Sequence, residues 1–175
     1  MRLLVIEGIP KKDRFREGLV LYEFLSMTIP DKVDFQEFEG SSELHSFLED
    51  YDMTEIEFIH LSGHGSVDGS ESKFLLPKGF LRPWEFPEDC FEDCVVTVSA
   101  CELGKKSFAD PLIEQTGAIS VIAPQREVLF IDSAVWFLNF YYFALHHEFR
   151  PGDAFNRIDS QLSDRVRGGF QYWMK

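Results

Sequence analysis

Basic residues and cysteines are scarce in this chain of 175 residues. Its 17 Lys and Arg are outnumbered by 30 Asp and Glu, which gives a formal net charge of −13. Such an excess of negative charge repels phosphate backbones and anionic lipid headgroups. We therefore expect neither nucleic acid nor a membrane as a partner, and we expect cationic peptides or proteins instead. The 3 cysteines are too few, and odd in number, for a disulfide framework, which favours a reducing compartment.

Long apolar runs are missing as well. The first run, Leu3-Leu4-Val5-Ile6, is too short for the hydrophobic core of a signal peptide. The longest apolar stretch, from Val128 to Leu145, is interrupted by Asp132, Ser133 and Asn139. These interruptions are typical of a buried helix rather than of a membrane span. We therefore expect a cytoplasmic protein.

What the sequence does contain is enough apolar material for one large core. Hydrophobic residues make up 45% of the chain and aromatic residues 15%, including 18 Phe. The length is that of one ordinary domain, and we find no internal repeat, linker or low-complexity segment. The sequence predicts a single domain over residues 1–175.

Hydrophobic periodicity predicts alternating strands and helices. Strands are predicted over 2–7, 33–38, 57–62, 95–100, 118–123 and 170–174, and helices over 15–27, 41–49, 107–115, 132–147 and 154–166. The intervening segment 65–93 contains Pro77, Pro83 and Pro87 and is predicted to be irregular. Strands that alternate with helices form right-handed crossovers and a mainly parallel sheet. We therefore predict an α/β fold with a three-layer α/β/α sandwich.

Ligands of an open parallel sheet bind beyond the carboxyl ends of its strands. After the first strand, Gly8-Ile9-Pro10-Lys11 lacks a phosphate-binding glycine pattern, which argues against a dinucleotide-binding or flavodoxin-like domain. The third strand runs into Ser62-Gly63-His64-Gly65, and the fourth into Ser99-Ala100-Cys101. His64 and Cys101 thus follow two strands that we expect to be neighbours, so their side chains can meet at one edge of the sheet.

A thiol becomes a good nucleophile near neutral pH when a base stands beside it, and an imidazole can later protonate a leaving amine. The backbone N–H groups of Gly65 and Cys101 can together receive an oxyanion. Ser99 lies two residues before Cys101, on the same side of the strand, where it can line a substrate pocket. Taken singly, a cysteine after a strand is more often a core residue, and a histidine beside glycine is usually solvated. Their matched positions favour a Cys101–His64 dyad.

Strand–Ser-Gly-His-Gly followed by strand–Ser-Ala-Cys-x-x-Gly resembles the caspase-like cysteine peptidases, above all the CHAT group of caspase and separase relatives. Segments 116–124, 132–145 and 171–173 are similar to the fifth strand, the next helix and the closing strand of that family. The resemblance implies a six-stranded sheet with an antiparallel last strand. It also implies an endopeptidase without cofactor or metal, with His64 as base and Cys101 as nucleophile.

The chain departs from the caspases themselves. Residues 99–103 do not match the caspase motif Gln-Ala-Cys, so cleavage after Asp is not implied. The resemblance instead suggests cleavage after Arg or Lys, because the place of Asp132 resembles that of acidic residues in relatives with this specificity. The alternative for Asp132 is a cap for the helix that begins beside it. The sequence ends directly after the closing strand, so we expect no attached helical repeat array, although CHAT domains often carry one.

Other signals are weaker. Cys90 and Cys94 lack a fourth ligand at a finger-like spacing, so we expect no zinc site. The basic pair Lys105-Lys106 is either a solvated pair or a self-processing site. The expected partners are a peptide or protein substrate and a protein that activates or recruits the enzyme. The alternative function is a catalytically silent caspase-like module that binds a protein partner.

Overall fold

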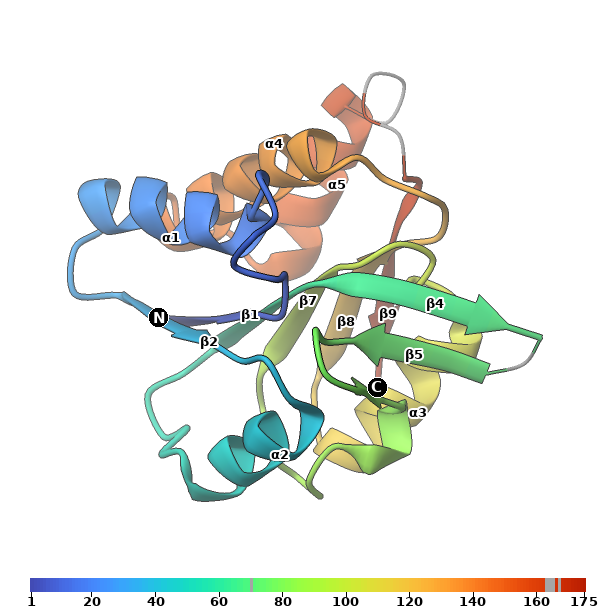
Figure 1. The fold of residues 1–175 in the computed structure, drawn as a ribbon. Coiled ribbons are helices and arrows are strands. Elements are labelled where there is room, and N and C mark those ends of the chain that lie inside the picture. Colours follow the sequence, from blue (N-terminus) through green and yellow to red (C-terminus); the bar gives the residue numbers. More distant parts are fainter. Residues whose placement is uncertain (70, 163–165, 167) are drawn as a thin grey trace.

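The computed structural model describes residues 1–69, 71–162, 166 and 168–175. Within these residues a six-stranded sheet has the strand order β2-β1-β3-β7-β8-β9 (Figure 1). Its strands are β1 (Leu3–Glu7), β2 (Val33–Glu37), β3 (Phe58–Ser62), β7 (Val95–Ser99), β8 (Ser120–Pro124) and β9 (Phe170–Met174). Neighbouring strands are parallel except for β9, which pairs antiparallel with β8. The predicted sheet is confirmed, including its antiparallel last strand.

Helices cover both faces of this sheet, so the predicted three-layer sandwich is confirmed. On one face lie α1 (Glu17–Thr28), α4 (Phe130–Tyr141) and α5 (Pro151–Leu162), and on the other α2 (Ser41–Asp50) and α3 (Lys106–Thr116) (Figure 1). The helix predicted from 132 to 147 is divided into α4 and a π-helical turn, η2 (Tyr142–His146). The helix predicted over 154–166 begins earlier, because Pro151 suits the first turn, and residues 163–165 of that prediction lie outside the described part.

The central strands are buried on both faces, which explains their continuous apolar sequences. Alternate residues of each strand enter two separate cores. Leu4 and Ile6 of β1 pack toward α2 and α3, whereas Leu3 and Val5 pack toward α1 and α4. The second core is rich in aromatic rings, and Trp136 of α4 stacks on a phenylalanine of β9 with ring centroids 4.3 Å apart. This packing fixes α4, whose first turn borders the candidate site.

The prediction that residues 65–93 are irregular is wrong. They contribute a three-stranded antiparallel sheet of β4 (His64–Asp68), β5 (Glu71–Leu75) and β6 (Phe80–Leu81), followed by a 3₁₀ turn, η1 (Pro83–Glu85). The strands are short and half polar, so their hydrophobic pattern is weak. The buried ring of Phe74 anchors them, because it packs directly on Gly63. A Cβ added to Gly63 would lie only 2.6 Å from this ring. Ser72 Oγ also lies 2.8 Å from Ser107 Oγ at the start of α3.

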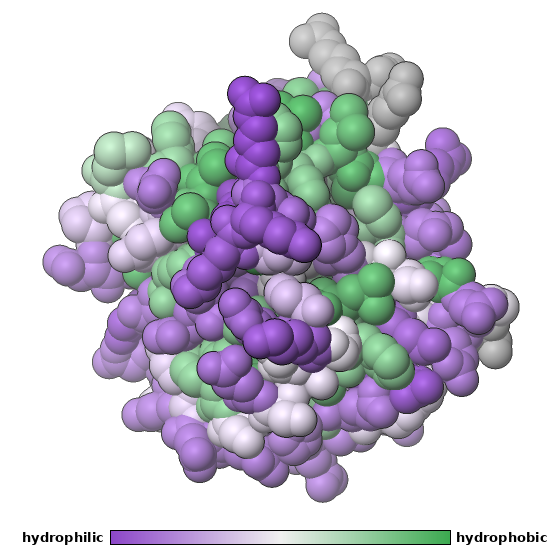
Figure 2. Space-filling view, in the orientation of Figure 1, coloured by the Kyte–Doolittle hydropathy of each residue, from purple (hydrophilic) through white to green (hydrophobic). Residues whose placement is uncertain are grey.

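Polar side chains cover most of the surface in Figure 2, and apolar side chains gather toward α1 and α4. Val20, Phe24 and Met27 of α1 are among the exposed apolar residues. Within the described part of the chain, none of the helices combines the length and the apolar character that crossing a membrane requires.

Candidate active site

His64 and Cys101 follow the carboxyl ends of the neighbouring strands β3 and β7, at the same edge of the sheet. In the parallel pair β3–β7, Ser62 is the register partner of Ser99, and each of the two residues follows its serine by two positions. The backbones also touch, because a Cβ on Gly65 would overlap the carbonyl oxygen of Cys101. Only glycine permits an approach this close. The structure therefore sets the two residues that the sequence singled out at equivalent positions beyond neighbouring strands, where their backbone segments touch.

Cys101 is the partly exposed cysteine of the three. Its sulfur lies 3.6 Å from the carbonyl oxygen of Val128 and 3.5 Å from the N–H of the same residue. The thiol can donate to that carbonyl, and the N–H donates to the sulfur. The second contact also suits a thiolate, because an N–H donor stabilises a negatively charged acceptor. Val128 thus holds Cys101 in place in the segment that leads into α4.

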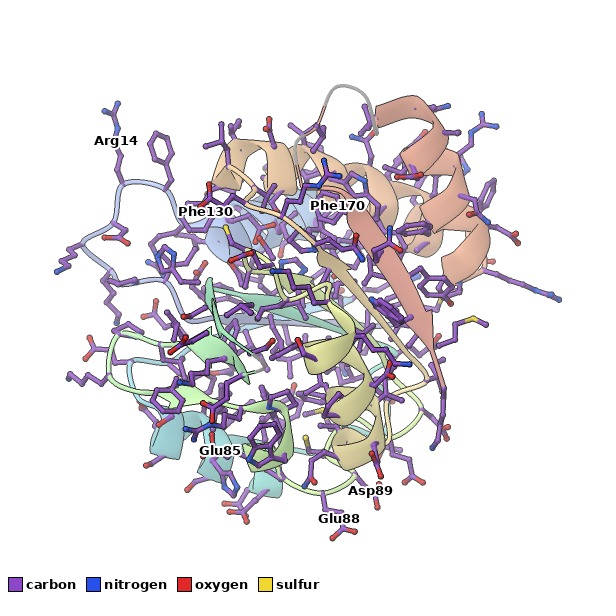
Figure 3. All side chains as sticks on the ribbon, turned by 90° about the vertical axis from the view of Figure 1, so that its right-hand side faces the viewer. Arg14, Glu85, Glu88, Asp89, Phe130 and Phe170 are labelled. Atoms are coloured by element: carbon purple, nitrogen blue, oxygen red, sulfur yellow. The ribbon has the colours of Figure 1, made fainter. Side chains whose placement is uncertain are left out.

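His64 is almost half exposed, with 46% of its side-chain surface accessible. Its Nε2 lies 3.9 Å from Oδ2 of Asp13, in the loop between β1 and α1. Its ring meets the ring of Phe130, the first residue of α4, edge to face with centroids 5.3 Å apart. Arg14, the residue after Asp13, lies at the same end of the molecule as Phe130 in Figure 3. Asp13 carries no sequence signal, since it is 51 residues from the histidine that it contacts.

Within the described residues, His64 and Cys101 are not hydrogen-bonded to each other. Asp13 is the charged partner of the imidazole, and Val128 supplies both polar contacts of the thiol. Catalytic hydrogen bonds are often long in a free enzyme and tighten when substrate binds. In the described residues the imidazole and the thiol thus follow neighbouring strands but are each held by other partners.

The two residues predicted to bind substrate lie at different depths. Ser99 is 1% exposed, and its Oγ lies 2.8 Å from Oγ of Ser133 in α4. It therefore lies beneath the site rather than forming an open wall. Asp132 is partly exposed in the first turn of α4. The N-cap of that helix is Leu129, and the structure describes no side-chain cap there, so the geometry does not support the capping alternative for Asp132.

The basic pair after Cys101 is engaged in local ion pairs. Lys105 Nζ lies 2.6 Å from Glu102, and the exposed Lys106 lies 3.5 Å from Asp110. Both lysines stand at the start of α3. Surface pairs of this kind contribute little to stability, and of the two lysines only Lys106 is exposed.

A buried polar cluster ties α1 to the sheet beside the site. Glu7, at the end of β1, accepts the N–H of Ile9 at 3.1 Å and the N–H of Leu19 at 2.9 Å. Ser62 accepts the N–H of Gly18 at 3.0 Å. Burial raises the pKa of the Glu7 carboxyl to about 7, against the opposing effect of these N–H donors. The loop that carries Asp13 is thus fastened at both of its ends.

A second buried cluster lies deeper on the same face of the sheet. His60 Nε2 lies 2.9 Å from Oε2 of Glu17, and its Nδ1 lies 2.8 Å from Oγ1 of Thr97 and 3.1 Å from the hydroxyl of Tyr141. Burial raises the pKa of Tyr141 well above its ordinary value, so this hydroxyl keeps its proton as a donor. Glu17 lies in the first turn of α1, where the helix dipole favours a carboxylate. The sequence did not identify this pair, whose members are 43 residues apart.

The other two cysteines lie at the opposite end of the sheet. Cys90 and Cys94 are buried free thiols, and burial raises their pKa values to about 12 and about 11. Cys94 Sγ donates to the carbonyl of Ile56 at 3.2 Å. Among residues 1–69, 71–162, 166 and 168–175 there is no group of three or more His, Cys, Asp or Glu that could hold a metal ion. Neither thiol is placed or ionised as a nucleophile would be.

No protein-family model and no curated protein matches this chain. The likeness to CHAT peptidases therefore stays a hypothesis, supported by the residues and the geometry described above.

The contact of Gly65 with Cys101 can be tested by stability. We expect Gly65→Ser to lower the free energy of unfolding by about 1–3 kcal/mol, because its Cβ must push the Cys101 backbone away. Gly40→Ser is the matched control, since the nearest atom to a Cβ there is 3.9 Å away and serine is favoured at that helix N-cap. Urea unfolding measures both variants. Equal stabilities would mean that the two backbones do not touch.

The buried carboxyl of Glu7 predicts a pH dependence of stability. The folded protein binds this proton up to about pH 7, whereas the unfolded chain releases it near its ordinary value of 4.5. The free energy of unfolding should therefore fall as the pH rises from 4.5 to 7, by up to about 3 kcal/mol from this group. In Glu7→Gln this part of the slope should vanish. Urea unfolding at several pH values, with the exposed Glu23→Gln as control, measures the difference. Identical slopes in wild type and Glu7→Gln would refute the assignment.

Proposed function

We propose that this protein is a caspase-like cysteine endopeptidase with a Cys101–His64 dyad. The observation that supports it most is the equivalent position of the two residues. Each follows a serine of the Ser62–Ser99 pair by two positions, at the ends of neighbouring strands, and Gly65 lets the backbones touch. A reducing, cytoplasmic setting suits this proposal, because the nucleophile must stay a free thiol.

In the proposed reaction His64 takes the proton from the sulfur of Cys101, and the thiolate attacks the carbonyl carbon of the scissile peptide bond. The new C–S bond creates a tetrahedral oxyanion. When the C–N bond breaks, His64 returns the proton to the leaving amine and an acyl-enzyme remains. Water, deprotonated by His64, then hydrolyses the thioester and releases the thiol. The residues of the chain supply every proton transfer, without a metal or an organic cofactor.

Two features suit Cys101 to this role. Within the described residues, the Cys101 N–H has no hydrogen-bond acceptor, which leaves it free for an oxyanion together with the N–H of Gly65. Cys101 is also partly exposed, whereas Cys90 and Cys94 are buried. Asp13 would act as a positioning residue, because its carboxylate lies on the Nε2 side of His64 and favours the imidazolium that forms during the reaction.

The proposed substrate carries Arg or Lys before the scissile bond. Asp132 offers a partly exposed carboxylate in the first turn of α4, one residue from Ser133, which contacts Ser99. A cationic side chain would pair with this carboxylate in the substrate pocket. The net charge of −13 would also attract basic peptides from solution.

The alternative is a catalytically silent module that binds a protein partner. It is favoured by one observation, namely that the polar contacts of the Cys101 sulfur are with Val128 rather than with His64. Labelling of the thiol separates the two functions, because a binding module needs no reactive cysteine.

The dyad is tested with a peptide probe that carries Arg and an activated carbonyl or epoxide. We expect labelling at Cys101 alone, no labelling of Cys101→Ala, and a rate at least about 100-fold lower in His64→Ala, because the thiol then lacks its base. Cys90→Ala should be labelled like the wild type. Mass spectrometry locates the modified residue, and circular dichroism verifies that each variant is folded. A folded wild type that resists the probe would favour the binding module, and label on Cys90 would contradict the assignment.

The specificity is tested by profiling a peptide library with the wild type and with Asp132→Asn. We expect cleavage after Arg or Lys, and a loss of about 10- to 100-fold in kcat/KM for these peptides in the variant, as for the loss of a charged hydrogen bond. Glu127→Gln, an exposed neighbour in the same segment, is the control and should change little. A preference for apolar or acidic residues that is unchanged in Asp132→Asn would refute this role.

A further inference from the structure

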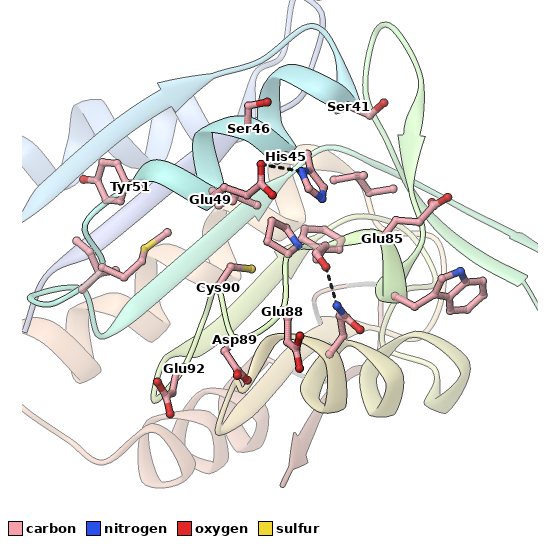
Figure 4. A pocket seen from close by; sticks show the side chains of 18 of the residues that line it. Ser41, His45, Ser46, Glu49, Tyr51, Glu85, Glu88, Asp89, Cys90 and Glu92 are labelled. Atoms are coloured by element: carbon pink, nitrogen blue, oxygen red, sulfur yellow. Dashed lines mark hydrogen bonds and ion pairs between the residues drawn. The ribbon is translucent and has the colours of Figure 1, made fainter.

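A groove of about 1490 Å³ lies between α2 and the segment from Trp84 to Asp93 (Figure 4). It adjoins the amino ends of β3 and β7, because Glu57 directly precedes β3 and Asp93 lies just before β7. His64 and Cys101 follow the carboxyl ends of the same strands, roughly 20 Å away at about 3.3 Å per residue. In Figure 3, Glu85, Glu88 and Asp89 accordingly lie at the end of the molecule opposite Phe130. The groove is therefore separate from the candidate active site.

The groove carries negative charge that the chain neutralises only in part, at Glu57 through the N-terminal ammonium and at Glu85 through Arg82. None of the described residues that line it is Lys or Arg. Glu88, Asp89, Glu92 and Asp93 form no ion pair within the described part of the chain. On the opposite wall, the only partner of Glu49 among the described residues is the imidazole of His45, at 3.5 Å. Figure 4 shows His45 and Glu49 on one side of the groove, and Glu88, Asp89 and Glu92 on the other.

Two helices add to this negative potential, independently of the side chains. The last turns of α2 and α3 both border the groove, through Glu49 and Gln115, and neither contains a basic residue. A helix C-terminus carries about half a negative charge and is stabilised by cations. Here the C-termini of α2 and α3 border carboxylates instead of cations. Backbone hydrogen bonds fix the acidic segment there, from Asp89 N to the carbonyl of Gln115 at 3.0 Å and from Phe91 N to that of Thr116 at 2.9 Å.

The rim of the groove combines aromatic rings with carboxylates. At one place the chain itself supplies the cation, since the guanidinium of Arg82 lies 4.9 Å from the ring centroid of Phe80 and 3.0 Å from the carboxylate of Glu85. Trp84 follows on the same rim with 51% of its surface exposed. Within the described residues, no cation lies over its ring. Trp84 thus offers an exposed ring without a bound cation in a groove that also carries unpaired carboxylates.

We propose that this groove binds an extended, Arg-rich peptide segment of a partner protein. The volume exceeds the roughly 300–1,000 Å³ of small-molecule sites, and a lining that runs from α2 to the end of α3 leaves room for a peptide segment. Arginine fits better than lysine, because its planar group stacks on a tryptophan and binds a carboxylate through two N–H groups. The proposal does not depend on peptidase activity, since the groove lies at the other edge of the sheet.

The test measures the binding of fluorescein-labelled nona-arginine to the full-length protein by anisotropy at low and moderate salt. Nona-lysine and nona-glutamate serve as comparison peptides. The groove variant combines Glu88→Gln, Asp89→Asn and Glu92→Gln. The matched control combines Glu23→Gln, Asp31→Asn and Glu148→Gln, which removes the same charge from exposed positions elsewhere. Trp84→Ala tests the aromatic contact without changing the charge.

We expect nona-arginine to bind more tightly than nona-lysine, and nona-glutamate not to bind. The groove variant should lose at least tenfold in affinity, the control variant less than threefold, and Trp84→Ala at least threefold. Equal losses in the two triple variants, or no binding by the wild type, would overturn the proposal. Spermine is tested as well. If it binds as tightly as nona-arginine, and if this binding is lost in the groove variant, the ligand is a small polycation and the peptide proposal is wrong. If the groove variant does not fold, the single variants Glu88→Gln and Trp84→Ala take its place, and the loss of nona-arginine affinity in each is compared with the wild type.

Discussion

The parallel pairing of β3 with β7 is the constraint on which the rest of the structure depends. It sets His60 beside Thr97 and Ser62 beside Ser99, and His64 and Cys101 form a third pair of equivalent positions, two residues beyond the strands. The first pair belongs to the buried polar cluster, the second lies beneath the site, and the third is the site itself. A shift of register by one residue would turn each of these side chains to the other face and dismantle all three.

The core beneath the site is unusually polar for a sheet that is covered on both faces. Glu7, Glu17 and His60 are all buried, and such groups are costly unless they find hydrogen-bond partners. Here the partners come from α1, from α4 and from the strands themselves, so these polar groups link both helices to the sheet, while Oε1 of Glu17 has no partner among the described residues. The apolar residues around them allow more than one arrangement, whereas a buried carboxylate with two N–H donors allows few. These hydrogen bonds also fix the position of the loop between β1 and α1.

The sequence was sufficient for the sheet, because each central strand is a continuous apolar run between helices with clear periodicity. It was also sufficient to place His64 and Cys101 at equivalent strand ends. It was insufficient for β4, β5 and β6, whose short half-polar segments pair through backbone hydrogen bonds that leave little trace in composition. Asp13 could not be found from the sequence, because a contact across distant loops has no local signal. The acidic groove was hidden for a similar reason, since its walls come from three separate segments.

The antiparallel hairpin of β4 and β5 also bears on how the chain folds. Parallel strands such as β3 and β7 can pair only after a long intervening segment has been closed into a loop, which makes such pairings slow. A hairpin forms from local contacts within microseconds and folds part of that segment back on itself. Each halving of the free loop reduces the entropic cost of closure by about 0.6 kcal/mol. The hairpin therefore lowers the cost of pairing β3 with β7. The segment 64–75 contributes little more than His64 and Gly65 to the candidate site, yet by this effect it favours the pairing on which the site is built.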